Sequence, residues 1–588
     1  MESPMNGIVS VRGSAKTDSL VNRLLMSRHS HGISMLMASA SLILWAVSIA
    51  QAKGEVMGDY GLFSVLPVTY YLGVFLLLAS MFYTVFSSKY NPGRSCLKLL
   101  LFQSFILMAF MLFTPTLIEG TARSPHSWLK YGYADYIVRN GHISQAVTHY
   151  HNWPAPFIYT AELVLASSLG SEWFPAVFPL VLDMMIFAAV AVFCLKFFKS
   201  TGGRYIAMML FFLLTWENQF HYVPQLFAFL LFLLIVYLGI FYLKKDNILM
   251  LAVIGVLYAV LLLTHLLTAF VAGVFLGIMV LLMLRPGSKP ARSGRRARSL
   301  RRFFRLKFWG RKLRRLRSTL LAHRRVVAII TVIGICGAVA WYIFARNWIT
   351  YAFHGASPNV WPMMISAYLD KLYTGSEAHG NLALMRMAFT ALIAGLAVVG
   401  GKMAYDRGKT RAAYAVAIAG IAPVFLFYYE AEILQRSLLF CGLAIAVLIT
   451  LGTGRRKFLA VAVVLCFLAV PIHTLAMYGN EKIDYTPPSQ IPGAEFMFDN
   501  IPSGIVVSGN QVEGREYIER YGRTDIYHVD RYLEGDLPVY VVRSSSSDYF
   551  SIWYLGDAST LNRQEAAVGR QGANLLFCSP DCRIYMLG

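Results

Sequence analysis

Long apolar runs alternate with short polar connectors along most of this chain. Runs of about 20 apolar residues are long enough to cross a hydrocarbon core of about 30 Å as helices. We therefore expect an α-helical multi-pass membrane protein with about thirteen transmembrane helices. Hydropathy places the spans at residues 33–50, 62–86, 97–118, 173–197, 205–217, 223–243, 247–263, 265–284, 326–345, 384–400, 411–429, 433–452 and 457–477.

Composition supports this class and excludes an ordinary soluble one. The 588 residues are 57% hydrophobic and only 14% charged, whereas a soluble chain carries about 25% charged residues. One apolar stretch, residues 155–170, is not counted as a span, because it contains Glu162 and follows two prolines. We expect it to lie in the membrane interface as an amphipathic helix.

The distribution of Lys and Arg predicts the orientation. With the thirteen spans above, the connectors that hold nearly all of the positive charge fall on one side, which the positive-inside rule makes cytoplasmic. The N-terminus is then cytoplasmic, and loop 119–172 and the C-terminal tail are extracytoplasmic. The cationic connectors are residues 87–96, 196–204, 244–246, 285–325, 401–411 and 453–457.

Much of the net charge of +22 lies in one connector, residues 285–325, which holds seventeen Lys and Arg and no acid. A basic block beside membrane helices is typical of a loop held by anionic lipid headgroups. Its arginines alternate with apolar residues, which favours an amphipathic helix on the membrane surface. Nucleic-acid binding is disfavoured, because aromatic side chains on which bases could stack are sparse there.

From about Gly479 the pattern changes to short β-like runs bounded by Gly, Pro and Asn. We expect three parts: 1–96, an N-terminal tail with two extra helices; 97–477, the main transmembrane domain; and 478–588, a small extracytoplasmic α/β domain. Cys578 and Cys582 flank a Ser-Pro-Asp turn, where their sulfurs could face each other across a hairpin. A disulfide is favoured only outside the cytosol, and two cysteines alone are an incomplete metal site.

Glu119 is the first candidate for chemistry. It ends the apolar run 97–118 and opens the His- and Trp-rich loop 119–172. Ionisable groups at the edge of a membrane are costly to place and are candidates for function. The plainer interpretation is that Glu119 only ends a span at the interface.

Further polar residues gather at four helix ends on the predicted outer side. Each has a plainer interpretation: Glu432 and Arg436 are spaced to pair on one helix face, Glu217 and His221 fit a polar helix tip, and the loop histidines fit exposed side chains better than metal ligands. A divalent cation is left open. The residues are Glu119, Arg123, His126, His149 and His151; Glu217, Asn218 and His221; His265; and Glu430, Glu432 and Arg436.

Residues 97–477 resemble the GT-C superfamily of integral-membrane glycosyltransferases. The resemblance is carried by the acid that opens a large first external loop and by the segments HNWPAPFIYTAELVLASSLGSEWF, YVPQLFAFLLFL, HLLTAF and EILQR. It implies transfer of a sugar from a polyprenyl-phosphate-linked donor to a glycan, lipid or protein acceptor outside the cytosol, with Glu119 as general base. The family position often holds Asp followed by another acid, whereas Gly120 follows here. The WWDxG signature of oligosaccharyltransferases is absent from the sequence.

The chemistry of the residues agrees with that role. A carboxylate at a semi-apolar boundary can accept the proton that a hydroxyl loses as it attacks the sugar. Arg436 suits the leaving phosphate, because guanidinium is a planar fork that matches phosphate oxygens; Arg123 and His265 are secondary candidates. We expect the remaining substrate-binding residues to be His126, His151, Glu217, His221 and Glu432.

Two other functions compete with the transferase. A transporter or flippase of a polyprenyl-linked glycan would place its charges near the bilayer midplane. Here the middles of the spans are nearly free of ionisable residues, with Asp183 as the main exception. A binding protein whose tail recognises wall polymers would explain the C-terminal domain but not the polar helix ends.

Overall fold

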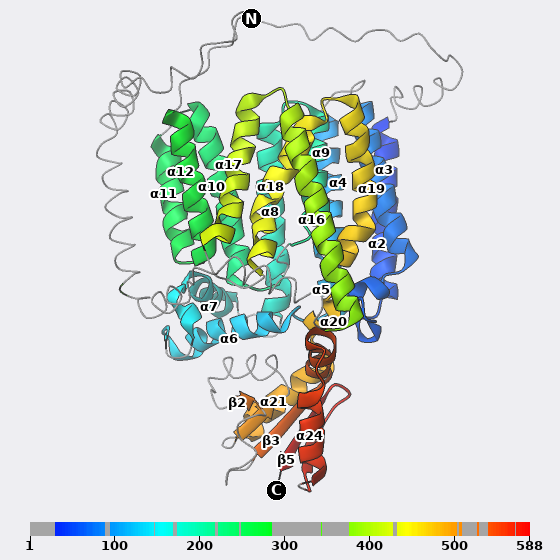
Figure 1. The fold of residues 1–588 in the computed structure, drawn as a ribbon, viewed down its shortest axis with the longest axis vertical. Helices are drawn as coiled ribbons and strands as arrows, with labels where there is room; N and C mark the ends of the chain where they lie inside the picture. Colours follow the sequence, from blue (N-terminus) through cyan, green and yellow to red (C-terminus); the bar gives the residue numbers. More distant parts are fainter. Residues whose placement is uncertain are drawn as a thin grey trace, which may run out of the picture.

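The computed structural model shows a helical bundle with a small globular domain at one end (Figure 1). It describes residues 30–88, 94–145, 148–167, 173–217, 221–245, 248–284, 343, 375–426, 432–501, 505–508, 526–528, 539–570 and 572–587. The basic connector 285–325, the expected span 326–345 except Ile343, and Glu430 lie outside the described residues, and expectations about them stay predictions.

The bundle helices overlap the predicted spans wherever the structure describes them. The helix of the expected span 62–86 begins only at Val68, and the expected span 97–118 is interrupted at Phe113. Seven of the described helices are long and apolar enough to cross a membrane, and others are apolar but shorter, so the number thirteen remains a prediction. The helices are α2 (Ser30–Gln51), α3 (Val68–Ser87), α4 (Arg94–Leu112), α8 (Phe174–Phe197), α9 (Thr201–Leu214), α10 (Pro224–Lys245), α11 (Ile248–Leu262), α12 (Leu266–Leu284), α16 (Glu377–Met403), α17 (Arg407–Leu426), α18 (Glu432–Gly452) and α19 (Arg456–Tyr478).

Small residues let the first two helices approach closely. The buried face of α2 carries serines and Ala38, and Ser41 Oγ donates to Gly73 O of α3 at 2.8 Å. In the other direction, Ser80 Oγ donates to Ser34 O at 2.7 Å. Contacts between backbone and small side chains replace the hydrophobic effect as the force between helices in lipid.

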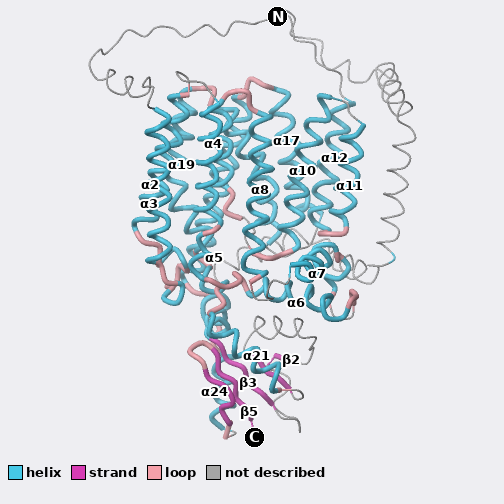
Figure 2. Tube along the Cα trace, turned by 180° about the vertical axis from the view of Figure 1, so that it is seen from behind, coloured by secondary structure: helices cyan, strands magenta, loops and turns pink. Residues whose placement is uncertain are grey.

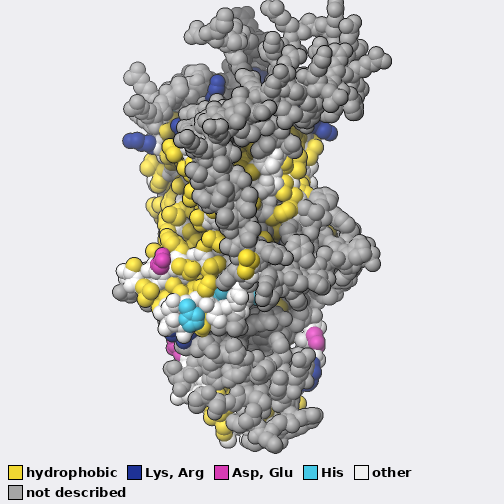
Figure 3. All heavy atoms as spheres, turned by 90° about the vertical axis from the view of Figure 1, so that its left-hand side faces the viewer, with side chains coloured by type: hydrophobic (Ala, Val, Ile, Leu, Met, Phe, Trp, Pro, Cys, Tyr) yellow, Lys and Arg dark blue, Asp and Glu magenta, His cyan; other side chains and the backbone are white. Residues whose placement is uncertain are grey.

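The cationic connectors lie together at one end of the bundle. The connectors between α8 and α9, α16 and α17, and α18 and α19 all lie at the end away from the sheet (Figure 1), and Lys and Arg flank the apolar band there (Figure 3). This grouping agrees with the one predicted from charge. Which end faces the cytoplasm stays a prediction.

A layer of short helices covers the opposite end of the bundle. It comprises α5 (Thr114–Glu119), α6 (Pro125–Asn140), the 3-10 turn η3 (His149–Asn152) and α7 (Ala155–Ser167). Both α6 and α7 lie across the end of the bundle and not along it (Figures 1 and 2). In α7, Phe157 is buried while Leu165 is 65% exposed, a two-sided pattern that fits the expected interfacial helix.

The tail forms the expected α/β domain around a mixed five-stranded sheet of order β2-β1-β3-β5-β4. Strand β1 is parallel to β2 and β3, whereas β5 is antiparallel to β3 and β4. Its elements are α20 (Glu481–Asp484), η5 (Pro488–Gln490), α21 (Ile491–Asn500), β1 (Ile505–Ser508), β2 (Ile526–His528), β3 (Val539–Ser544), α23 (Ser545–Tyr549), the π-helical η7 (Phe550–Leu555), α24 (Ser559–Arg570), β4 (Asn574–Cys578) and β5 (Cys582–Leu587).

The expected hairpin at Cys578 and Cys582 is present as β4 and β5. Cys582 is buried, whereas Cys578 is exposed. Cys582 pairs across the sheet with Ser544, and Cys578 pairs with Arg583.

Trp553 holds the tail against the bundle. Its indole Nε1 donates to Asp59 O at 2.8 Å in the connector between α2 and α3. Its ring meets His379 of α16 edge to face, with centroids 4.9 Å apart, and its carbonyl accepts from Ser376 N at 2.8 Å. The side chain is only 2% exposed. This one tryptophan therefore joins the tail both to the connector between α2 and α3 and to the start of α16.

Replacing this tryptophan should loosen the tail. We expect Trp553→Ala to destabilise docking by about 3–5 kcal/mol, because a large buried ring and its hydrogen bond are lost. Limited proteolysis of the membrane-embedded protein would measure this as faster cleavage within residues 481–587. The control is Ile552→Ala, next in sequence but 55% exposed; equal cleavage rates in the two variants would contradict the assignment.

Candidate active site

Glu119 is the last residue of α5, where the chain turns out of the bundle. Gly120 ends the helix with φ of +69°, and its N–H donates to Thr116 O; a side chain at that position would be strained. The Glu119 side chain is only 4% exposed. The structure therefore places this carboxylate inside the protein at the end of the bundle, and not on an open loop.

The loop after Glu119 is held by the start of the tail. Thr121 Oγ1 donates to Thr486 O at 2.9 Å, and Ser124 N donates to Asp484 O at 2.7 Å. Ser124 adopts a positive φ of 66° although it is not glycine, and its hydroxyl caps α6 by accepting from His126 N. Such a conformation persists only when the surroundings fix it, so the loop is rigidly placed beside Glu119.

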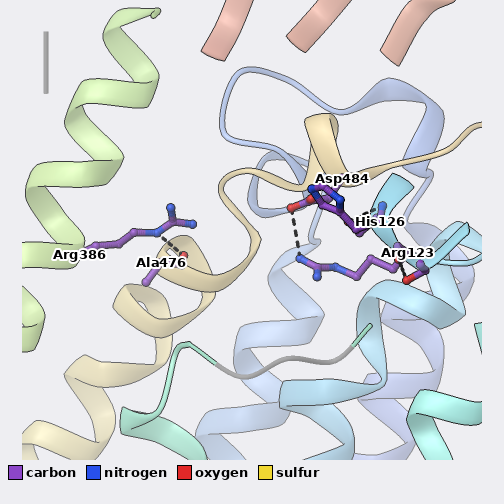
Figure 4. A network of polar contacts seen from close by, with 7 residues as sticks. Arg123, His126, Arg386, Ala476 and Asp484 are labelled. Carbon is purple, nitrogen blue, oxygen red and sulfur yellow. Dashed lines mark hydrogen bonds and ion pairs between the residues drawn. The ribbon is translucent and has the colours of Figure 1, made fainter. Parts of the chain in front are cut away.

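Two electrostatic contacts connect this loop with the tail. Arg123 Nη2 lies 3.7 Å from Asp484 Oδ2 (Figure 4). Burial raises the pKa of the neighbouring Tyr485 phenol, and the charge of Glu119 raises it further. Glu119 and Arg123 therefore both lie within electrostatic reach of residues 484–485, which the sequence analysis did not connect with the site.

Basic side chains converge around His221, in the connector between α9 and α10. Burial lowers the pKa of His221 well below its usual value, and the charges of Arg123, His126, Arg436 and Lys130 lower it further. His221 is therefore neutral at physiological pH. Charges from the first loop and from α18 thus act on one point, which makes this end of the bundle attractive to an anion.

Arg436 and His265 bring two more helix ends to the same place. Arg436 Nη1 donates to Gln225 Oε1 at 3.0 Å, so α18 meets the first turn of α10. His265 Nδ1 lies 3.0 Å from Thr268 Oγ1 at the start of α12. His265 lies within electrostatic reach of the Arg436 guanidinium.

The other expected residues are placed differently. Glu217 and His221 lie in a connector and not on a helix, so the spacing of a helix tip does not apply to them. Glu432 begins α18, but its side chain and Asn218 lie outside the described parts of the chain. His126 and His149 are exposed, as expected for loop histidines.

His151 departs from the expectation of an exposed histidine, because it is fully buried. Its Nε2 lies 3.1 Å from Tyr133 O, and its Nδ1 lies 2.9 Å from Ser144 N. Nδ1 also lies 2.9 Å from Ser144 O, so each ring nitrogen contacts a backbone carbonyl oxygen. The His151 ring therefore joins Ser144 to Tyr133 of α6.

Two buried cations were missed by the sequence analysis. Lys130 is 6% exposed, and its Nζ lies 3.4 Å from the centroid of the Tyr150 ring. Arg386, 9% exposed, donates from Nε to Ala476 O at 2.7 Å, and its guanidinium lies 5.2 Å from the ring of Trp216 (Figure 4). Arg386 had a usable signal, since it is the one ionisable residue within the expected span 384–400.

Asp183 is buried within α8, beside a cavity of about 10 Å³. Phe211, Phe229 and Leu439 are among the apolar residues that line it. This volume holds about one water molecule, so the cavity is far too small for a sugar. Within the described residues there is no group of three or more His, Cys, Asp or Glu side chains that could hold a metal ion.

The fold and site define a multi-pass helical membrane protein with buried charges at the end that carries a small α/β domain. No family model and no curated protein matches this chain. Among solved structures, it is similar to ArnT from Cupriavidus metallidurans bound to undecaprenyl phosphate, with TM-score 0.47 and 12% identity over 84% of this chain and 98% of that one. The apo state of the same protein matches with TM-score 0.39 and 12% identity, over 84% and 97% of the two chains.

The buried histidine predicts a pH dependence in the first loop. Burial lowers the pKa of His151, while contacts with Ser144 and Tyr133 partly offset this. Because the closed conformation of the loop disfavours protonation of the His151 ring, this conformation has its full stability above about pH 6.5. It loses stability as the pH falls below that value. Hydrogen exchange of residues 141–153, corrected for intrinsic rates, should therefore show more opening at pH 5 than at pH 7.5.

Variants of neighbouring histidines separate this effect from general acid sensitivity. His151→Gln should remove most of the pH dependence, whereas the control His149→Gln, at an exposed position, should keep it. Retention of the full pH dependence in His151→Gln would show that another group is responsible.

Proposed function

We propose that this protein is a membrane glycosyltransferase that moves a sugar from a polyprenyl-phosphate-linked donor to an envelope glycan, lipid or protein on the extracytoplasmic side. Two observations support the proposal: a buried carboxylate, Glu119, ends α5 at this end of the bundle, and the charges of Arg123 and Arg436 both act on His221. An acid for deprotonation and cations for phosphate are the two parts that such a transfer needs.

Glu119 is the proposed general base. An acceptor hydroxyl loses its proton as its oxygen attacks the anomeric carbon, and a carboxylate within hydrogen-bond reach accepts that proton. Glu119 suits this role because it is shielded from bulk water yet sits at the end of a helix, where the chain leaves the membrane. The helix end at Gly120 and the hydrogen bonds of Thr121 and Ser124 to the tail hold the backbone beside this carboxylate in place before substrate binds.

Arg436 is the proposed partner of the leaving phosphate. Charge develops on the phosphate oxygen as the bond to the sugar breaks, and a fixed guanidinium stabilises it through two parallel hydrogen bonds. Gln225 orients Arg436 through the 3.0 Å contact. His265 and His221 are the proposed hydrogen-bonding groups beside it.

The remaining residues have supporting roles in this proposal. Arg123 adds a second cation, and exposed His126 and the connector residue Glu217 are the proposed contacts to the acceptor. Glu432, one helical turn before Arg436 in the sequence, is a further proposed substrate contact. His151, also expected to bind substrate, holds residue 144 to α6 through its ring nitrogens.

A transporter or flippase of a polyprenyl-linked glycan is the alternative. Asp183 is the feature in its favour, because an acid inside a span is typical of transport pathways. The cavity beside Asp183 has room for about one water, whereas the charges that gather at the bundle end suit surface chemistry. The transferase is therefore the better supported function.

The base is tested by Glu119→Gln. We expect transfer to fall about 10²- to 10⁴-fold, because the amide cannot accept the proton, while the lipid-linked donor accumulates in cells. Surface glycans and lipid-linked sugars would be profiled in a deletion strain restored with each variant. Glu162→Gln is the control, since Glu162 is an exposed acid of the same loop. Full rescue by a well-expressed Glu119→Gln would remove Glu119 as base.

The phosphate partner is tested by Arg436→Gln in the purified protein. Loss of a charge-assisted contact should raise the KM for the donor about tenfold to a hundredfold, and Arg436→Lys should recover only part of it, because Lys is a point charge. Arg411→Gln, in α17 at the opposite end of the bundle, is the control. An unchanged KM would mean that another cation, such as Arg123, holds the phosphate.

A further inference from the structure

The tail brings a carboxylate into the candidate site. Asp484, the last residue of α20, pairs with Arg123 across 3.7 Å. The Arg123 side chain is 6% exposed, whereas that of Asp484 is 28% exposed. The Asp484 carboxylate is thus the more solvent-exposed partner of the pair. Figure 4 shows the two side chains facing each other.

The charge of Asp484 is separable from its role in holding the loop. Residues 121–124 are fixed to the tail by the backbone carbonyls of Asp484 and Thr486, which accept from Ser124 N and Thr121 Oγ1. Ser127 Oγ also donates to Arg123 O. An asparagine at position 484 keeps all of these contacts and removes only the negative charge.

The proposed reaction changes the charge of the phosphate that Arg123 faces. The acceptor oxygen bonds to the anomeric carbon, the carbon–oxygen bond to phosphate breaks, and its electron pair stays on the phosphate. The acceptor proton goes to Glu119. The donor is a phosphodiester with one negative charge, whereas the product is a monoester with a charge of about −1.5 to −2 near pH 7. The product therefore binds a cluster of cations more tightly than the donor does.

We propose that Asp484 competes with the product phosphate for Arg123 and so promotes release of the polyprenyl phosphate. This inference rests on the proposed function. Because the Arg123–Asp484 pair lies at a partly exposed edge, its attraction is modest, and a doubly charged phosphate displaces the carboxylate on binding. When the phosphate leaves, the ion pair between Asp484 and Arg123 forms again.

The test compares binding of undecaprenyl phosphate to variants of the full-length protein in detergent, without turnover. Asp484→Asn should lower the Kd about fivefold and increase product inhibition of transfer. Asp484→Glu, which keeps the charge, should bind like the wild type. Arg123→Gln should raise the Kd, and Asp484→Asn should then have no further effect. Asp135→Asn, which breaks the 3.0 Å Arg139–Asp135 pair of α6, is the matched control and should leave the Kd unchanged.

The outcomes separate this inference from the function beneath it. A wild-type protein that does not bind undecaprenyl phosphate would overturn the proposed donor class and the inference together. If the wild type binds but Asp484→Asn binds equally, the pair is only structural. If Asp484→Asn binds more weakly, Asp484 orients Arg123 for the phosphate. Either of the last two results overturns the competition and leaves the transferase proposal standing.

Discussion

Lipid offers no hydrogen bonds to an exposed peptide group, and this constraint shapes the whole molecule. Every backbone N–H and C=O inside the hydrocarbon must be satisfied within its own helix, so the described apolar runs are helical. Irregular backbone, such as the turn at Gly120 and the connector that holds His221, is confined to the end of the bundle. The charged groups of the candidate site lie there as well, whereas Asp183 and Arg386 are exceptions that are buried within helices.

The periodicity of the chain predicted most of this framework. The described spans and the surface helix α7 lie close to their expected positions, since length and apolarity alone determine a membrane helix. The tail's sheet was also foreseeable from its short runs. Its mixed order, with β3 between β1 and β5, was not, because pairing depends on contacts between distant residues that no local pattern records.

The site was foreseeable only in part, and the reason is again distance along the chain. Glu119, Arg123 and Arg436 stand out because each is a charge at a helix end. Asp484 does not, since it lies in an ordinary polar stretch and matters only through a partner 361 positions earlier, at Arg123. His151 was misjudged for a related reason: its neighbours in sequence are polar, but in space it is enclosed by the loop's own backbone.

The contacts between the first loop and the tail have a consequence for how the protein is made. Thr121 and its partner Thr486 are separated by 365 residues, so a ribosome must synthesise nearly the whole membrane domain before the loop can be completed. Until then the loop beside Glu119 lacks the acceptors of its hydrogen bonds, although its flanking helices are already in the membrane. A prematurely terminated chain would thus be inserted in the membrane with this loop still incomplete.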